Sequence, residues 1–218
     1  MDFQTFLSLV PKIKNVSLPG EVAHSKMAPP ERAELIKSID WAQVKPKRAA
    51  VLMLVFPMDG QAHLALIQRN EYKGVHSAQI AFPGGKIEPT DPTPLHTALR
   101  ETNEEIGVTV NSVVVARQFS RVYIPPSNFE VTPFLGFVDD EPFFNPDPRE
   151  VAAMVKVSLA DFLDDASIVI NQMSTSYSQS IGVPAFKLTD KIVWGATAMM
   201  LSELKEVLKA ALSTDTIL

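Results

Sequence analysis

The stretch FPGGKIEPTDPTPLHTALRETNEEIGV, residues 82–108, constrains this chain more than any other part of its sequence. A loop rich in glycine and proline leads into a segment whose apolar residues recur at helical spacing. We predict a helix from Thr93 or Pro94 to Ile106, with Gly107 just beyond its end. Thr93 can act as the N-cap with Pro94 following it, and Asp91 with Pro92 is the alternative.

Charged side chains crowd the second half of this predicted helix, where Arg100, Glu101, Glu104 and Glu105 follow within six positions. At about 100° per residue the three glutamates fall within an arc of about 100°. Carboxylates one turn apart repel each other by a few tenths of a kcal/mol per pair, so the crowding must serve a purpose. The adjoining face is expected to pack on a core; its members are Leu95, Ala98, Leu99, Thr102 and Ile106.

Three carboxylates on one helical face suit a hard divalent cation, since Mg²⁺ takes oxygen ligands and commonly bridges carboxylates to substrate phosphates. Arg100, at the edge of this face, can hold a carboxylate in one rotamer. The alternative is a solvated acidic face with Arg–Glu pairs inside the helix, which is common on protein surfaces. The preceding Gly84-Gly85-Lys86 favours the first interpretation, because glycine amides can approach a phosphate without an intervening side chain.

The whole stretch resembles the Nudix box, in which a glycine and a glutamate precede Arg-Glu-apolar-x-Glu-Glu-x-Gly-apolar. Residues 100–108, RETNEEIGV, match the second half with Thr102 in place of the usual apolar residue. The interval from Gly85 to Arg100 is one residue longer than the general pattern, and Asp91 stands near the position of its first glutamate.

This departure resembles the coenzyme A pyrophosphatase branch of the Nudix superfamily. The upstream stretch LIQRNEYKGVHSAQIAFPGGK is similar to the second signature of that branch, with Ala78 in place of its usual glycine. Residues 123–133, YIPPSNFEVTP, and 194–201, WGATAMML, are also similar to it.

The resemblance implies metal-dependent hydrolysis of the diphosphate in coenzyme A or acyl-coenzyme A, giving adenosine 3′,5′-bisphosphate and (acyl-)4′-phosphopantetheine. Alternatives are another nucleoside diphosphate derivative as substrate, or a nucleotide-sensing module that does not cleave. It implies Mg²⁺ or Mn²⁺ as the cofactor. The implied metal ligands are Glu101, Glu104 and Glu105; the implied catalytic residues are these three with Arg100, which orients Glu101, and Glu150; and the implied substrate-binding residues are Arg69, His76, Gly84, Gly85 and Lys86.

Two of these residues have equally good structural explanations. Glu150 can accept a proton from the attacking water, or can merely begin a strand at the surface. His76 can contact a substrate phosphate, or can be a loop histidine satisfied by the backbone.

The order of elements predicts one mixed sheet flanked by helices, a Nudix-type α/β/α sandwich of the α/β (α+β) class. Residues 1–46 form a helical lead-in that packs on the domain or joins two copies, residues 47–213 form the domain, and residues 214–218 form a tail. A hairpin turning at Asp59-Gly60 opens the domain. Three β-rich segments, a short helix at LADFLDD, a polar loop at residues 171–180, a last hairpin and a closing amphipathic helix follow.

Composition excludes several classes of function. The chain of 218 residues has no cysteine, which rules out disulfides, cysteine-ligated metals and cysteine nucleophiles. Its net charge of −5 argues against nucleic acid and membrane as main partners. The N-terminus is a poor signal peptide and the longest apolar run is too short to span a bilayer. We expect a cytoplasmic monomer or homodimer that acts on a small nucleotide.

Overall fold

The computed structural model describes residues 1–70, 79–173 and 181–213. The predicted substrate residue His76 and the tail 214–218 lie outside these ranges. The helices are α1 (Phe3–Asn15), α2 (Glu21–Ser25), α3 (Arg32–Ser38), α4 (Pro94–Ile106), α5 (Leu159–Leu163) and α6 (Gly195–Ser213), with 3₁₀ turns η1 (Val110–Ser112), η2 (Pro125–Ser127) and η3 (Asp165–Ser167). The strands are β1 (Lys47–Met58), β2 (Gln61–Arg69), β3 (Ile80–Ala81), β4 (Gly84–Lys86), β5 (Val114–Gln118), β6 (Val122–Ile124), β7 (Phe129–Phe137), β8 (Val151–Ser158), β9 (Ile168–Met173), β10 (Ile181–Leu188) and β11 (Lys191–Val193).

Strand β1 organises the main sheet. It pairs antiparallel with β2 and β4 and parallel with β7, so the sheet is mixed, as predicted. Strands β3 and β8 extend it beyond β2, and β5 and β6 extend it from β7. The predicted hairpin is confirmed: Asp59 and Gly60 both have positive φ, the conformation that a tight two-residue β-turn requires.

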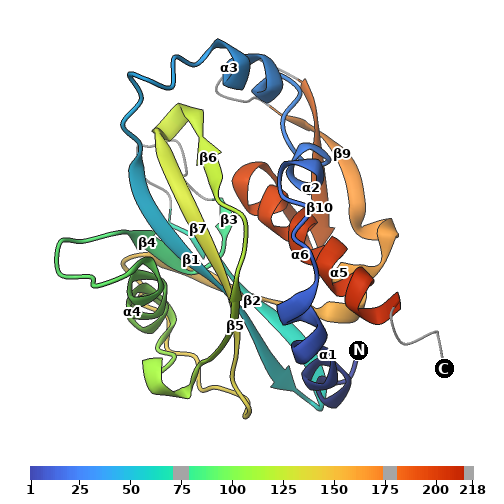
Figure 1. The fold of residues 1–218 in the computed structure, drawn as a ribbon. Helices are drawn as coiled ribbons and strands as arrows, with labels where there is room; N and C mark the ends of the chain where they lie inside the picture. Colours follow the sequence, from blue (N-terminus) through green and yellow to red (C-terminus); the bar gives the residue numbers. More distant parts are fainter. Residues whose placement is uncertain (71–78, 174–180, 214–218) are drawn as a thin grey trace.

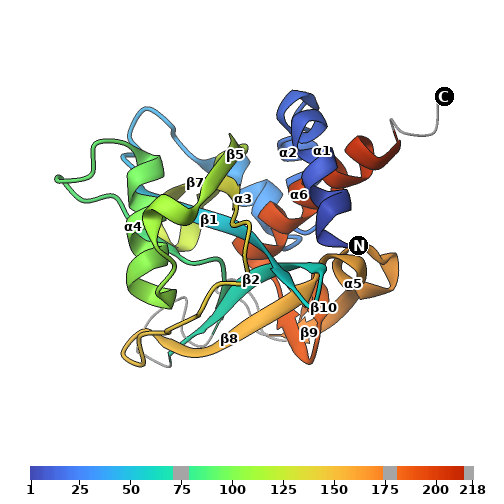
Figure 2. The ribbon, with the colours of Figure 1, turned by 90° about the horizontal axis from the view of Figure 1, so that it is seen from below.

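The two faces of β1 bury alternate side chains against different helices. Leu52, Leu54 and Phe56 belong to the core that includes Ala98 and Ile106 of α4. Met53 and Val55 belong to the core that includes α1 and α6. Figures 1 and 2 show the result, with α4 on one side of the sheet and α1, α2 and α6 on the other. Because successive strand residues point to opposite faces, one run of apolar residues builds both layers. The predicted α/β/α sandwich is confirmed.

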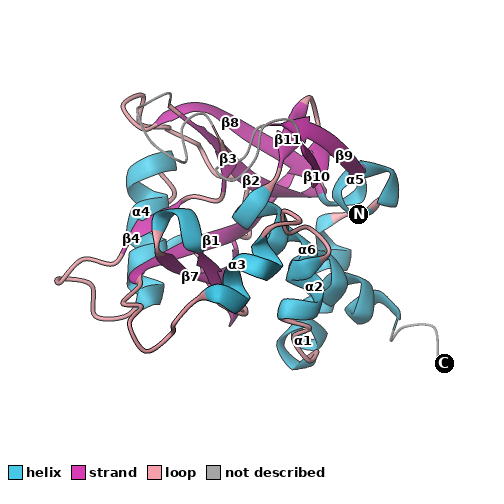
Figure 3. Ribbon diagram, turned by 90° about the horizontal axis from the view of Figure 1, so that it is seen from above, coloured by secondary structure: helices cyan, strands magenta, loops and turns pink. Residues whose placement is uncertain are grey.

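A second, smaller antiparallel sheet has the order β11-β10-β9 and contacts α6 through β10 (Figure 3). The predicted last hairpin, β10 and β11, is confirmed. Strand β9 was not predicted: residues 171–173, assigned to a polar loop, are the end of a strand. Ile168, Val169 and Ile170 are apolar, but Asn171 and Gln172 after them are polar, and this polar half was assigned to the loop.

Helix α4 begins and ends as its sequence indicates. The Thr93 side chain accepts a hydrogen bond from the His96 amide, which makes Thr93 rather than Asp91 the N-cap, and Gly107 closes the helix at a φ of 77°. The predicted core face is confirmed: Ala98 and Ile106 belong to the core, and the half-buried Leu95 and Leu99 pack against it. Glu105, assigned to the charged face, is buried as well.

The lead-in packs against α6, and a buried carboxylate joins the two. Glu203 of α6 is fully buried and accepts hydrogen bonds from the Gly20 amide (2.9 Å), the Ser120 amide (3.1 Å) and the Ser120 hydroxyl (2.6 Å). His24 Nε2 lies 3.4 Å from it. Burial acts to raise the pKa of Glu203, but the contacts with His24 and Ser120 outweigh burial and lower it. Within the described ranges no helix is both long and apolar enough to cross a bilayer.

Replacing Glu203 with glutamine should lower the free energy of unfolding by about 1–3 kcal/mol, because the amide group would turn a donor toward donors that now reach a carboxylate. Urea denaturation at pH 7 measures the change. The matched control is Glu206→Gln, which removes an exposed ion pair with Lys26 and should cost about 0–1 kcal/mol.

The Glu203 effect should also depend on pH. Since folding lowers the pKa of Glu203 below its ordinary value of 4.5, its ionised form stabilises the fold above that pH and the contribution is lost as the pH falls below it. The difference between wild type and Glu203→Gln should therefore narrow on acidification. A difference that widens below pH 4.5 would contradict this.

Candidate active site

Glu105 joins the end of α4 to β4 and is only 1% exposed. Its Oε2 accepts a hydrogen bond from the Gly84 amide (2.8 Å), and its Oε1 from Arg69 Nη1 (3.1 Å). Burial raises the pKa of Glu105 to about 7, against the lowering by the Gly84 amide and Arg69. Glu101 and Glu150 raise it further by repulsion. The carboxylate is therefore held in one orientation while close to neutralisation at physiological pH.

Glu101 lies one turn before Glu105 and packs directly over Gly85. A Cβ at position 85 would collide with the carboxylate carbon and both oxygens of Glu101. Only glycine allows this approach, which explains a requirement for glycine in the loop. Burial also raises the pKa of Glu101, Arg100 lowers it, and Glu104 and Glu150 raise it.

Arg100 is clamped from outside the helix by Asp91. Arg100 Nε and Nη2 donate to the two carboxylate oxygens of Asp91 at 3.0 Å each, and Asp91 also accepts from the Thr97 hydroxyl at 2.9 Å. Hydrogen bonding to Arg100 holds the pKa of Asp91 well below its usual range. The remaining guanidinium nitrogen, Nη1, lies 2.9 Å from Glu101 and 2.9 Å from Glu104. Arg100 thus orients two glutamates, and Asp91 orients Arg100.

Asp91 is the residue whose role sequence reasoning missed. Its position near the first glutamate of the resembled pattern was the available signal. Nothing in the spacing indicated that it would accept two hydrogen bonds from Arg100, nine residues later.

Glu104 and Glu150 form the exposed edge of the same region. Glu104 is more than half exposed and bound to Arg100. Glu150 is exposed and directly precedes β8, and the Asn70 amide donates to its carbonyl oxygen (3.0 Å). The charge of its side chain reaches both Glu101 and Glu105, since it raises the pKa of each. Glu150 therefore both borders a strand and belongs to the same cluster of carboxylates as Glu101, Glu104 and Glu105.

The donor set fits a hard divalent cation in its chemistry. Glu101, Glu104, Glu105 and Glu150 offer only oxygen, and two of them lie in the last turn of α4, where the helix dipole opposes negative charge and which itself contains no basic residue. In the described part of the chain, however, no three acidic or histidine side chains gather closely enough to hold an ion. The reason lies in the arginines: Arg100 stands between Glu101 and Glu104, and Arg69 holds Glu105.

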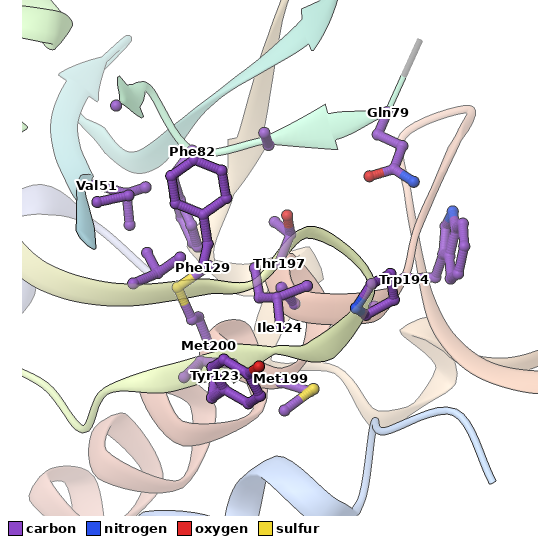
Figure 4. Close-up of a pocket in the computed structure, with 18 of the residues that line it drawn as sticks. Val51, Gln79, Phe82, Tyr123, Ile124, Phe129, Trp194, Thr197, Met199 and Met200 are labelled. Atoms are coloured by element: carbon purple, nitrogen blue, oxygen red, sulfur yellow. The ribbon is translucent and has the colours of Figure 1, made fainter. Parts of the chain in front are cut away.

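A cavity of about 390 Å³ adjoins this region. Arg69, Gly84, Gly85 and the exposed Lys86 form one part of its wall, so three sequence-predicted substrate residues that contact the glutamates also border the cavity. The remaining wall is mostly apolar. Figure 4 shows Phe82 and Val51 on one side and Tyr123 with Met199 of α6 on the other.

Much of this wall was not predicted from sequence. Met199 and Met200 of α6 are buried, and they also border the cavity. Trp194 lies in a segment whose resemblance was noted without a role, and Pro29 and Arg32 come from the lead-in. Only the folded chain brings these segments to the glycine loop.

Comparison with known proteins identifies the family. The NUDIX domain matches residues 46–174. The chain is 34% identical over 172 residues to the mitochondrial Nudix hydrolase 15 of Arabidopsis thaliana, covering 75% of this chain and 59% of the relative. It is 33% identical over 163 residues to the mitochondrial coenzyme A diphosphatase NUDT8 of Mus musculus, covering 72% and 75%. Among solved structures, an Ap4A hydrolase from C. elegans aligns with a TM-score of 0.51 at 16% identity, covering 77% of this chain and 98% of that one.

The match with one further relative is shorter. It reaches 51% of the length of NudL from Yersinia enterocolitica, at 37% identity over 100 residues. The chain thus spans between half and three fifths of several of the curated relatives it matches. The matched segment contains the glycine loop, α4 and Glu150, and it exceeds half of the chain. The chain belongs to the Nudix family.

Proposed function

We propose that the protein is a metal-dependent diphosphatase that hydrolyses coenzyme A or acyl-coenzyme A to adenosine 3′,5′-bisphosphate and (acyl-)4′-phosphopantetheine. The observation that carries the proposal is the junction at Gly84-Gly85, where clustered carboxylates meet a cavity with apolar and cationic walls. A diphosphate needs charge neutralisation at one end of such a site, and a nucleoside or pantetheine group needs apolar surface at the other. The name of the NUDT8 relative supports the same substrate.

The proposed reaction is a single hydrolysis. The oxygen of a water bonds to one phosphorus of the diphosphate, and the bond from that phosphorus to the bridging oxygen breaks. The bridging oxygen leaves with the other phosphate, and the water gives up a proton. Glu150, one of the two exposed carboxylates at this site, is the proposed acceptor of that proton.

Each remaining residue has a positioning or binding role. Glu101, Glu104 and Glu105 are the proposed ligands of Mg²⁺ or Mn²⁺, and Arg100 sets the rotamers of Glu101 and Glu104. When bound, the metal neutralises phosphate charge and lowers the pKa of water. Arg69, Lys86 and His76, with the backbone of Gly84 and Gly85, are the proposed phosphate contacts. Arg69 can exchange its bond with Glu105 for one to phosphate when a cation takes up that carboxylate.

The cytoplasm as compartment and a monomer or homodimer as the working form stay predictions from the sequence. The direct test of function is incubation with Mg²⁺ or Mn²⁺ and coenzyme A, followed by chromatography of the products. Turnover of ADP-ribose or a dinucleotide in place of coenzyme A would move the substrate to another nucleoside diphosphate derivative. Binding without any cleavage would favour a sensing module.

Replacing Glu101 with glutamine should lower kcat at least about 100-fold and leave the fold intact, because it removes the charge of a proposed metal ligand that Arg100 orients. The measurements are kcat on coenzyme A and Mn²⁺ affinity by calorimetry. The exposed Glu34→Gln in α3, whose carboxylate pairs with Lys37, is the control and should change neither. Unchanged Mn²⁺ affinity in Glu101→Gln would sink the assignment of Glu101 as a ligand.

Replacing Gly85 with alanine should lower kcat about 10-fold or more, because the new Cβ must displace the Glu101 carboxylate. The thermal midpoint should change little, since the colliding atoms are the far end of a side chain. Gly60→Ala is the matched control: it has open space around it and a φ of 72°, so it should cost stability of about 1 kcal/mol but no activity. Full activity in Gly85→Ala would contradict the role of the close approach.

A further inference from the structure

The far wall of the cavity comes from segments beyond the part of the chain that matches the family, residues 46–174. Pro29 and Arg32 reach it from the lead-in, and Trp194, Met199 and Met200 from the start of α6 and the turn before it. Substrate contacts made there can distinguish one diphosphate substrate from another without involving the carboxylates of Glu101, Glu104, Glu105 and Glu150.

Charge on the wall is of one sign. The charged residues that line the cavity, within the described ranges, are Arg32, Arg69 and Lys86, with no aspartate or glutamate among them. Arg69 and Lys86 flank the glycine loop and are accounted for by the diphosphate. Arg32 comes from a different segment, at the opposite end of the chain from α6, and the diphosphate chemistry assigns it no role.

Arg32 is a buried cation with an incomplete set of strong contacts. It is 8% exposed. In the described part of the chain its Nη1 donates to Glu21 at 2.7 Å and its Nη2 donates to the Tyr123 carbonyl oxygen at 3.4 Å, which is long for a hydrogen bond. The Glu21 side chain is 67% exposed, so water screens its charge and this ion pair stabilises Arg32 only weakly. A guanidinium has five N–H donors and binds phosphate through two at once.

We propose that Arg32 is a specificity-determining residue that binds a phosphate monoester on the nucleoside end of the substrate, separate from the diphosphate. The inference rests on the proposed function, because coenzyme A carries one such group, the 3′-phosphate of its ribose. In this contact the Arg32 guanidinium exchanges the exposed carboxylate of Glu21 for a doubly charged phosphate. Tyr123, whose carbonyl meets Arg32 and whose ring packs at 5.2 Å from Trp41, fixes the wall beside it.

The competing role for Arg32 is structural. Through Glu21 and the Tyr123 carbonyl it also ties the lead-in to β6. A purely structural arginine would lower stability when replaced and would affect all nucleotides alike. The two roles therefore separate by comparing ligands that differ in one phosphate.

Calorimetric binding of adenosine 3′,5′-bisphosphate and of 5′-AMP, without metal, measures this directly. The wild type should bind the bisphosphate at least about tenfold tighter, the range of one charge-assisted hydrogen-bonded contact. In Arg32→Gln the ratio of the two dissociation constants should fall close to one. Arg32→Lys keeps the charge but loses the planar pair of N–H donors, so it should retain part of the preference. Arg121→Gln, which removes an exposed arginine paired with Glu130 outside the cavity, should keep the full preference.

The same comparison in turnover uses coenzyme A and 3′-dephospho-coenzyme A. Arg32→Gln should raise the KM for coenzyme A toward the KM for 3′-dephospho-coenzyme A. For coenzyme A, KM should change more than kcat. An unchanged preference in Arg32→Gln, or equal weakening of both ligands with a lowered thermal midpoint, would overturn the proposal. Absence of cleavage of either coenzyme by the wild type would instead defeat the proposed function, while the binding ratio would still decide the role of Arg32.

Discussion

The burial of the Glu105 carboxylate between α4 and β4 is the interaction on which the site depends. One oxygen receives the amide of Gly84, and the other receives Arg69 from the end of β2. This places the last turn of α4 against the glycine loop, brings Glu101 over Gly85 and fixes the mouth of the cavity. A buried carboxylate with one amide and one arginine is costly, as its raised pKa shows. Perturbed carboxylates of this kind are often found at functional sites, which agrees with the proposed role of Glu105.

A second set of contacts makes this arrangement specific. Asp91 anchors Arg100 with two hydrogen bonds, and Arg100 then reaches two glutamates with its remaining nitrogen. The chain of Asp91, Arg100 and Glu101 links the loop before α4 to the face of the helix. Because each member is held by the next, the carboxylate positions are determined before any ligand arrives.

Local sequence signals predicted most of the elements and part of the site. The caps of α4, the hairpin at Asp59-Gly60 and the alternation along β1 follow from spacing within a few residues, and the structure has all three. The helical arc placed Glu101, Glu104 and Glu105 on one face but could not distinguish exposed Glu104 from buried Glu105, since that depends on where β4 lies. Strand β9 was missed because polar Asn171 and Gln172 follow its short apolar run. The Arg32 contact and the cavity wall depend on long-range packing, which no short window of sequence contains.

The layered arrangement also separates changes to the far wall of the cavity from changes to the carboxylates of α4. The carboxylate helix packs on one face of β1, whereas the lead-in and α6 pack on the other and supply the far wall of the cavity. Substitutions near either end of the chain can thus reshape what the cavity accepts while leaving the carboxylates of α4 undisturbed. A fragment trimmed to the family-matching segment would keep the glutamates yet lose both the wall and the apolar cover of Met53 and Val55. Such a fragment would be a poor reporter of which nucleotides the intact chain prefers.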